Sequence, residues 1–356
     1  MQNRSRCGFG EAAARQKEGK DEMIISASRR TDIPACYGQW MIARLRAGEV
    51  LVPNPYNASR ISRVALSPGN VDCIVFWTKN AAPMLPLLDE LDALGYKYYF
   101  EYTVTGYGSA LEPGLPEKER TVDTFLRLSE RLGPEGVDWR FDPVLLTSSI
   151  TPAWQLEHFG ALCHALHGAT RRCVFSFADP YPGIRPSIAP LEETQMRLLA
   201  KEFADIAGEY GLPLYTCAEA VELSEYGIRH AACIDSAKVE RIAGYPIRVE
   251  RDPGQRPACG CAASVDIGVY NTCPNGCTYC YATTRPALLR RARAVHAPDA
   301  PMLTGWPRGG EQITVAGVFV QQLGKRRCLT TFKSQKGRRP GDGSPSFEGA
   351  AKAAAL

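Results

Sequence analysis

The sequence has no long uninterrupted hydrophobic run. A helix that crosses a membrane needs about 20 consecutive apolar residues, and no stretch of the 356-residue chain approaches that length. The first twenty residues are polar and charged and hold no hydrophobic segment of the kind found in signal peptides. We therefore expect a cytoplasmic protein with no membrane partner.

The short motifs of several large enzyme classes are missing too. The chain contains no GxSxG nucleophile elbow, no GxxxxGK(S/T) phosphate loop and no GxGxxG dinucleotide fingerprint. Its five histidines form no HExxH pair and lie outside the cysteine cluster described below. Hydrolytic zinc chemistry and the reactions of the three missing motifs therefore have no support in the sequence.

The folded part of the chain lacks an excess of positive charge. The net charge of the whole chain is +4, but residues 321–356 carry +6 and residues 1–20 carry +3, which leaves −5 for residues 21–320. A nucleic-acid-binding domain normally shows a basic patch. The charge of the folded part therefore does not support a nucleic-acid partner.

The remaining composition is that of an ordinary globular protein. Hydrophobic residues make up 45% of the chain and charged residues 22%, which excludes collagen-like, wholly disordered and small disulfide-scaffold proteins. A length of 356 residues allows two domains, or one α/β barrel of about 250 residues with appendages.

From Met23 onward, short β-rich segments alternate with helical patterns. The expected strands lie near 23–28, 73–77, 97–104, 137–142, 172–177 and 213–217, with a weaker one near 230–234. The expected helices lie near 36–47, 83–94, 117–132, 153–167 and 190–210. Such alternation indicates parallel βαβ units. We expect an α/β fold, a complete or partial (β/α) TIM-like barrel, with a doubly wound open sheet as the alternative.

The alternation stops near residue 245, after which proline, glycine and cysteine become frequent. This change divides the chain into four expected parts. They are a disordered N-terminal extension (1–22), the barrel (23–245), a cysteine-rich iron–sulfur-binding segment (246–320) and a basic disordered tail (321–356).

Polar side chains recur where one expected strand after another ends. In barrels and open parallel sheets alike, this carboxyl edge carries the active site. Arg140 and Asp142 share one face of a strand, so they form either a buried ion pair that fixes the barrel or a substrate contact. Asp32 is expected to cap a helix rather than to act as a catalytic acid. The candidates for catalysis at this edge are Arg29, Lys79, Glu101, Arg140, Asp142 and Glu219.

Thirteen cysteines are many for a chain expected in a reducing compartment. Five of them fall between Cys259 and Cys280, and most others sit singly in apolar segments, where cysteine behaves as a small buried hydrophobic residue. The odd number argues against a complete disulfide framework. The cluster is the most informative part of the sequence.

Cys273, Cys277 and Cys280 follow a CxxxCxxC spacing. On a helix this spacing would place all three on one buried face, but Pro274 and Gly276 favour a turn instead. We favour a loop that holds an iron–sulfur cluster, because three thiolates would leave the fourth iron of a [4Fe–4S] cube free for another ligand.

Zinc is the main alternative for the cluster. Cys259 or Cys261 could complete a tetrahedral site with the three later cysteines, although zinc sites more often pair short CxxC knuckles. In the iron–sulfur interpretation, Cys259 and Cys261 are candidates for auxiliary ligation or for protection of the cluster.

Cys273, Cys277, Tyr279 and Cys280 match the CxxxCxΦC motif, with Φ aromatic, of the radical S-adenosylmethionine enzymes. The loop therefore resembles the cluster loop of that superfamily. The resemblance implies a [4Fe–4S] cluster whose free iron chelates S-adenosylmethionine, reductive cleavage to a 5′-deoxyadenosyl radical, and a reductant such as ferredoxin or flavodoxin. Tyr279 is the candidate contact for the bound adenine.

A longer resemblance covers residues 23 to 285. It is carried by the segments 24–34, 76–80, 139–143, 216–219 and 259–282. The chain is similar to domain-of-unknown-function family 1848, which has a C-terminal cysteine cluster resembling the radical S-adenosylmethionine motif and no established reaction. The resemblance identifies no substrate. We expect a small-molecule substrate or one of a kind that the sequence does not reveal.

The position of the loop departs from the superfamily. In radical S-adenosylmethionine enzymes the cysteine loop follows the first strand of the barrel, whereas here it follows the last expected strand. A permuted barrel, or a loop reaching over the barrel mouth, would bring it to the same place. We therefore expect a radical S-adenosylmethionine-type enzyme. The alternative is a barrel with a structural zinc knuckle, acting as a binding or nucleic-acid-processing module.

Overall fold

The computed structural model describes residues 23–179, 188 and 190–316. The expected N-terminal extension (1–22) and basic tail (321–356) lie outside these residues. In the described part of the chain, no helix is long and apolar enough to cross a membrane.

One large parallel sheet organises the fold, and its eight strands follow the order β10-β1-β4-β5-β6-β7-β8-β9. All seven pairs of neighbouring strands are parallel. The strands are β1 (Ile24–Ala27), β4 (Cys73–Thr78), β5 (Tyr98–Thr103), β6 (Val137–Val144), β7 (Cys173–Phe177), β8 (Leu214–Thr216), β9 (Arg229–His230) and β10 (Val265–Asp266). The α/β fold class is thereby confirmed.

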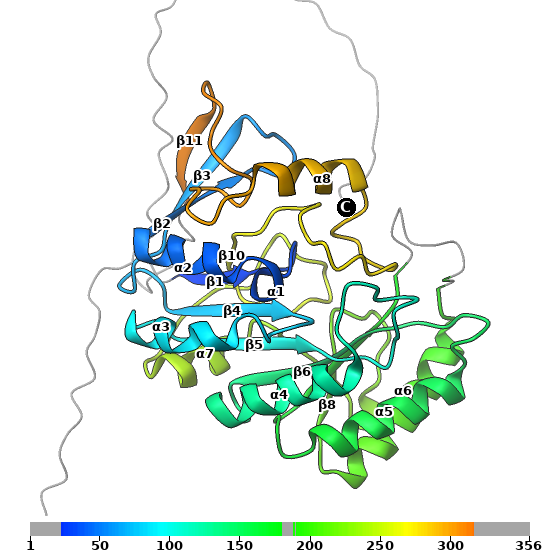
Figure 1. Ribbon diagram of the computed structural model, residues 1–356. Coiled ribbons are helices and arrows are strands. Elements are labelled where there is room, and N and C mark those ends of the chain that lie inside the picture. The colour runs from blue at the N-terminus through cyan, green and yellow to red at the C-terminus, as the bar shows by residue number, and fades with distance from the viewer. Residues whose placement is uncertain (1–22, 180–187, 189, 317–356) are drawn as a thin grey trace, which may run out of the picture. The chain divides into compact units, whose positions relative to one another are not determined.

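Helices connect the strands and cover one face of the sheet. From β1 to β8 each crossover moves to the next position in the same direction, and right-handed crossovers of this kind place their helices on one face. Figure 1 shows α3, α4, α5 and α6 along that side. The helices are α1 (Ile33–Cys36), α2 (Gly38–Ala47), α3 (Leu88–Ala93), α4 (Lys118–Leu132), α5 (Pro152–Leu166), α6 (Glu193–Glu209), α7 (Ser236–Ala243) and α8 (Pro286–Val295), with 3₁₀ turns at Leu85–Leu87 and Ser224–Tyr226.

The sheet is buried on both faces because its side chains alternate. In β4, Ile74 and Phe76 pack into the main core beside the helices, whereas Cys73 and Val75 face a second core. That second core is completed by residues from 231 to 262, which include α7 and cover the face opposite α3, α4, α5 and α6. Every residue of β4 except Trp77 is buried, as its near-continuous apolar sequence predicts.

A smaller sheet lies outside the predicted pattern. It has the order β11-β3-β2, with β2 (Glu49–Pro53) antiparallel to β3 (Arg60–Ala65) and β11 (Gln312–Ala316) parallel to β3. The six main expected strands are found at their predicted places. The expected strand near 230–234 is only the two-residue β9, and the cysteine-rich segment contributes β10, α8 and β11.

Candidate metal centre at the carboxyl edge of the sheet

Strand β10 brings the cysteine-rich segment to the sheet beside the first strand of the chain. Val265 pairs with Ile25 and Asp266 with Ser26, in parallel register. Because parallel strands end at the same edge, the chain after Asp266 emerges next to the residues that follow β1. The cysteine loop therefore starts at the carboxyl edge, where the sequence predicts the active site.

The carboxylate of Asp266 fixes this junction. It accepts hydrogen bonds from Ser26 Oγ at 2.8 Å, from Ser28 Oγ at 2.6 Å and from the backbone amide of Arg29 at 2.8 Å. At Gly268, two residues later, a Cβ atom would lie 2.0 Å from Ser28 Oγ. Only glycine allows the chain to pass this close to the end of β1.

The cysteine loop, residues 273–280, is anchored on two sides. Asn275 Nδ2 donates to Asp32 Oδ2 at 3.2 Å, and the amide of Thr278 donates to the carbonyl of Leu111 at 2.9 Å. The amide of Gly114 donates to the carbonyl of Asn275 at 2.9 Å. The loop is thus held between α1 and the segment that follows β5.

Asp32 connects three elements at this edge. It caps α1 by accepting from the amide of Ala35 at 3.0 Å, as the sequence predicts. It also accepts from Thr78 Oγ1 at 2.7 Å and from the amide of Lys79 at 2.8 Å, at the end of β4. Burial raises the pKa of Asp32, and these hydrogen bonds oppose the rise.

Cys273, Cys277 and Cys280 are partly buried. Burial raises the pKa of the Cys277 thiol to about 12, and the nearby Lys79 ammonium opposes this rise. Cys273 is hydrogen-bonded to the side chain of Cys36 at the end of α1, a contact that lowers the pKa of Cys273 and raises that of Cys36. Cys36 Sγ also donates to Asn275 Oδ1 at 3.8 Å, so Cys36 lies beside the cysteine loop.

Tyr279 and Lys79 meet at a buried carboxylate, Glu112. The Tyr279 hydroxyl and Lys118 Nζ both donate to Glu112, and Lys79 Nζ lies 3.1 Å from its Oε1. Burial by itself raises the pKa of Glu112, but Lys79 and Lys118 bring it below its ordinary value. The Tyr279 ring is buried, with Lys79 Nζ 5.3 Å and the Tyr107 ring 5.8 Å from its centre, and its contact with adenine stays a prediction.

Glu101 and Arg140 belong to a buried ion-pair network. Arg140 Nη1 lies 3.2 Å from Glu101 Oε2, and Arg172 Nη2 lies 3.5 Å from its Oε1. Arg172 also pairs with Asp138 at 2.6 Å, and Lys238 pairs with Asp138 at 2.8 Å. Glu101 is 0% exposed. Arg140 also pairs with Asp142, as the ion-pair alternative for those two residues supposes.

The other predicted residues lie closer to the surface of this edge. Asp142 accepts from Arg140 and Ser176, and Arg29 lies 3.6 Å from Asp252 and 5.4 Å from the ring of Trp77. Glu219 accepts from the amide of Phe177 at 2.8 Å, and burial raises its pKa to about 7. Their catalytic roles stay predictions.

Cys259 and Cys261 interact with two other cysteines: Cys261 is hydrogen-bonded to Cys259 and Cys233, and Cys259 interacts electrostatically with Cys217 and Cys233. The zinc alternative, in which Cys259 or Cys261 joins the three later cysteines, stays a prediction. Among the residues with described structure, no set of three or more histidine, cysteine, aspartate or glutamate side chains is already arranged to hold a metal ion. To bind a metal ion, the side chains of Cys273, Cys277 and Cys280 would therefore have to rotate. The same holds for the group formed by Cys217, Cys233, Cys259 and Cys261.

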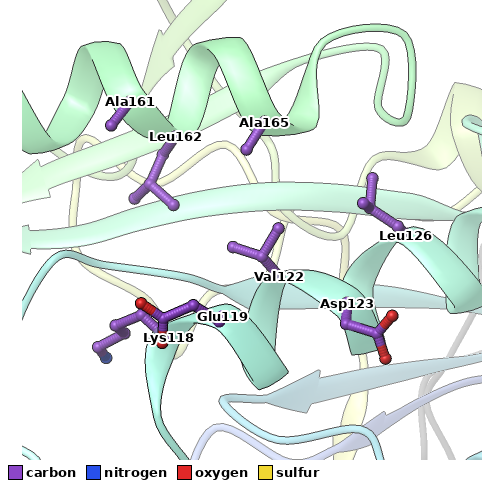
Figure 2. Close-up of a pocket in the computed structure, with 8 residues that line it drawn as sticks. All are labelled: Lys118, Glu119, Val122, Asp123, Leu126, Ala161, Leu162 and Ala165. Atoms are coloured by element: carbon purple, nitrogen blue, oxygen red, sulfur yellow. The ribbon is translucent and has the colours of Figure 1, made fainter.

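A separate open groove of about 440 Å³ lies on the helix layer. Figure 2 shows its lining, with Val122 and Leu126 on α4 and Leu162 on α5. None of the predicted site residues lines the groove; among its lining residues, Lys118 contacts Glu112.

The sequence matches the family described as "Domain of unknown function (DUF1848)" over residues 24–282. The chain belongs to this family. The DUF1848 match includes the ends of strands β1 to β8 and the whole cysteine loop. No curated protein matches the sequence.

Likeness of this DUF1848 protein to solved structures is slight. A protein provisionally assigned as an alpha-L-fucosidase from Bacteroides thetaiotaomicron VPI-5482 has a TM-score of 0.26 and 8% identity, over 76% of this chain and 93% of that one. GH5_18 from Streptomyces cattleya has a TM-score of 0.28 and 13% identity, over 56% and 44%. An amidohydrolase from an environmental sample of the Sargasso Sea has a TM-score of 0.32 and 12% identity, over 82% and 64%. At these TM-scores the likenesses say nothing about the reaction.

Sequence reasoning missed Cys36, Glu112 and Asn275 as members of the site. Glu112 lies in a segment rich in glycine and proline, and Cys36 looks like one more isolated cysteine. Asn275 lies inside the motif, between two of the cysteines, and its anchoring role could have been inferred from the preference of asparagine for turns that hydrogen-bond the backbone or a neighbouring group.

Proposed function

We propose that the protein is a radical S-adenosylmethionine-type enzyme whose [4Fe–4S] cluster is held by Cys273, Cys277 and Cys280. One observation supports this above the others. In the order of the sheet, β10 is the first strand and β1 the second, so the cysteine loop follows the first strand in space although it follows the last one in sequence. This is the arrangement expected of a permuted barrel of that superfamily.

We further propose that the sheet is a partial (β/α) barrel. The unidirectional crossovers support a curved, singly wound sheet, and the second core supplies the filling of its interior. The carboxyl edge then forms the mouth, where the cysteine loop lies beside the ends of β1, β4 and β5.

The residues present fit a cluster with one open iron. Three partly buried thiols come from one loop, and Lys79 next to Cys277 supplies positive charge beside the thiolates. Cys36 is close enough to hydrogen-bond Cys273, whereas thiolates on different irons of one cube are kept apart by the bridging sulfides. In this proposal Cys36 is a donor to a ligand and the fourth iron stays free, an assignment that the Cys36→Ala variant tests. Once bound, such a cluster would supply one-electron reductive cleavage of S-adenosylmethionine.

The side chains around the loop have distinct tasks in this proposal. Glu112 accepts hydrogen bonds from Lys79 and Tyr279 and so holds both side chains in place. Lys79 also donates to the carbonyl of Asp142 at 3.3 Å, which links the cysteine loop to the end of β6. Asp142, Arg29 and Glu219 are the groups we assign to contact with the substrate, because Glu101 and Arg140 are committed to the buried network.

The test is anaerobic reconstitution of the full-length protein with iron and sulfide. EPR spectra of the dithionite-reduced protein are then recorded with and without S-adenosylmethionine. We expect a [4Fe–4S]⁺ signal that changes when S-adenosylmethionine is added, and loss of the signal in Cys277→Ala. Cys163→Ala, which removes a lone buried cysteine on α5, serves as the control and should keep the signal. A full iron complement in Cys277→Ala would contradict the proposal.

A further inference from the structure

A second group of four cysteines gathers on the face of the sheet opposite the helices. Cys217 directly follows β8, Cys233 follows β9, and Cys259 and Cys261 lie in the loop that leads to β10. We call these residues the four-cysteine ring. Cys233, Cys259 and Cys261 are 1%, 7% and 2% exposed, and all three belong to the second core, against which Cys217 packs.

The sulfur atoms of the ring are neighbours. Cys233 Sγ lies 3.5 Å from Cys217 Sγ. Cys261 forms side-chain hydrogen bonds with both Cys233 and Cys259, and Cys259 interacts electrostatically with Cys217. Each sulfur therefore has another one beside it. A disulfide would need a separation of about 2 Å, and all four cysteines are free.

The backbone holds the two halves of the ring together. The amide of Ala262 donates to the carbonyl of Ile234 at 2.8 Å, and the amide of Ile234 donates to Cys261 Sγ at 3.4 Å. Amide donors to sulfur favour the thiolate form over the thiol. The loop that carries Cys259 and Cys261 is thus fixed against the segment that carries Cys233.

Two guanidinium groups face the ring. Arg140 Nη1 donates to Cys233 Sγ at 2.8 Å. Arg29 interacts electrostatically with Cys261 and Cys233, and its Nη2 is buried without a hydrogen-bond partner. A buried donor without a hydrogen-bond partner destabilises the fold unless an acceptor or a negative charge lies nearby. Four thiolates around one divalent cation carry a net charge of −2, which two guanidinium groups would offset.

We propose that Cys217, Cys233, Cys259 and Cys261 bind one tetrahedrally coordinated metal ion. Zinc is the metal that four thiolates favour when no redox chemistry is involved. In such a site, with Zn–S bonds of about 2.3 Å, neighbouring sulfurs are about 3.8 Å apart. The separation of 3.5 Å between Cys217 and Cys233 fits one shared ion better than a cube, whose bridging sulfides hold the ligand thiolates farther apart.

In the thiol form, each S–H group can donate to the next sulfur. Deprotonation removes these donors, and rotation about χ1 then lets the four sulfurs turn toward a common centre. Such rotations are between staggered positions and need no change of backbone. The contacts of the thiol form are therefore compatible with loading of a metal ion.

The ion would join the two ends of the sheet. Within the described residues, β9 and β10 are the edge strands and are not paired with each other. Cys217 and Cys233 follow the strands at one end, and Cys259 and Cys261 precede the strand at the other. The metal thus closes the gap between the edge strands and holds β10, with the cysteine loop behind it, in place. This inference does not depend on the proposed function.

The first test uses the unmodified full-length protein. It is produced with zinc in the medium, its metal content is measured, and the zinc ligands are identified by X-ray absorption. We expect one zinc per chain, with four sulfur ligands at about 2.3 Å. Absence of zinc, or a shell of nitrogen and oxygen ligands, would overturn the proposal without any variant having to fold.

The second test distinguishes the ring from the cysteine loop. Zinc is measured in Cys233→Ser, in Cys277→Ser and in the control Cys163→Ser. We expect loss of most of the zinc in Cys233→Ser alone. Zinc that is lost in Cys277→Ser and retained in Cys233→Ser would place the ion in the cysteine loop and overturn the proposal. If Cys233→Ser does not fold, cobalt is substituted into the unmodified protein, where sulfur-to-cobalt charge-transfer bands of a tetrahedral site are expected and their absence would refute it.

Discussion

Asn275 Nδ2 lies 3.2 Å from Asp32 Oδ2, although 243 residues separate them in the sequence. This bond joins the middle of the cysteine loop to the residue that caps α1 and binds the end of β4. This buried hydrogen bond is one of the contacts that fix the predicted iron ligands relative to the sheet, and substitutions at four positions around it and in the ion-pair network can be tested.

Asn275→Ala leaves the buried carboxylate of Asp32 with one donor fewer. We expect a loss of about 1 to 3 kcal/mol in the free energy of unfolding, together with weaker retention of iron. Asn275→Asp has nearly the same shape but places a second carboxylate against Asp32, and it should lose more. Urea denaturation and iron analysis of both variants measure the effect. Equal stability of Asn275→Asp and the unmodified protein would show that the bond is unimportant.

Gly114→Ala tests the close approach of the loop to the segment after β5. A Cβ atom at residue 114 would lie 2.6 Å from the carbonyl oxygen of Asn275, so the cysteine loop must move. We expect a cost of about 1 to 3 kcal/mol and a lower yield of reconstituted cluster. The matched control is Gly108→Ala, where a Cβ atom would meet no heavy atom within 4 Å. Similar cluster yields from the two variants would contradict the described packing.

Cys36→Ala tests whether the fourth iron is free. If Cys36 is a donor to Cys273 rather than a ligand, as we propose, the variant should keep nearly all of its iron and the response of the EPR signal to S-adenosylmethionine. A small change in reduction potential is expected, since hydrogen bonds to ligand sulfurs tune that potential. Loss of the cluster in Cys36→Ala would instead identify a fourth cysteine ligand and remove the open site.

Glu101→Gln tests the cause of a pH dependence of stability. Burial, with a further contribution from Asp138, raises the pKa of Glu101 from 4.5 to about 8. Between these values the folded protein binds a proton that the unfolded chain has released, so this group makes the fold less stable as the pH rises through that window. Its contribution falls by about 1 kcal/mol for each pH unit.

Glu101→Gln removes the carboxyl group and, with it, this contribution to the pH dependence of stability. Urea denaturation at pH 5 and pH 8 should show a smaller decline for Glu101→Gln than for the unmodified protein. Glu157→Gln, an exposed position on α5, is the control. Equal declines in Glu101→Gln and the unmodified protein would mean that Arg140 and Arg172 keep Glu101 ionised throughout this range.

The central part of the sheet could be predicted from the sequence because its strands bury both faces. Cys73–Thr78 is almost entirely apolar and is followed by polar residues. Its length and composition are typical of a strand that is buried on both faces. The carboxyl edge of the sheet can then be predicted as well, since the ends of parallel strands meet there. Arg29, Lys79 and Asp142 were accordingly found at this edge, while Glu101 and Arg140 proved to be buried in the ion-pair network.

Other features depend on contacts that no local pattern carries. β10 has only two residues, Val265 and Asp266, and they are too few to show a period. Cys217 and Cys233 each follow a strand and resemble isolated buried cysteines, so the contact between them emerges only in three dimensions. The hairpin of β2 and β3 was missed although its strands are as long as β4 and β7; β3 is partly exposed and contains two arginines, which obscure a strand pattern.

The pairing of β10 with β1 also sets the order in which the protein can be completed. Ser26 Oγ donates to Asp266 at 2.8 Å, but the two residues lie 240 positions apart in the sequence. Strand β1 therefore leaves the ribosome long before β10 has been synthesised. Until then one side of β1 has unpaired backbone groups, which in a nascent chain are an opportunity for wrong pairing. Both groups of cysteines need residues beyond 258, so neither of the two proposed metal sites can be complete during most of translation. If these sites bind metal as proposed, its delivery would be a late event, on a chain whose helices α1 to α7 and central strands have already been synthesised.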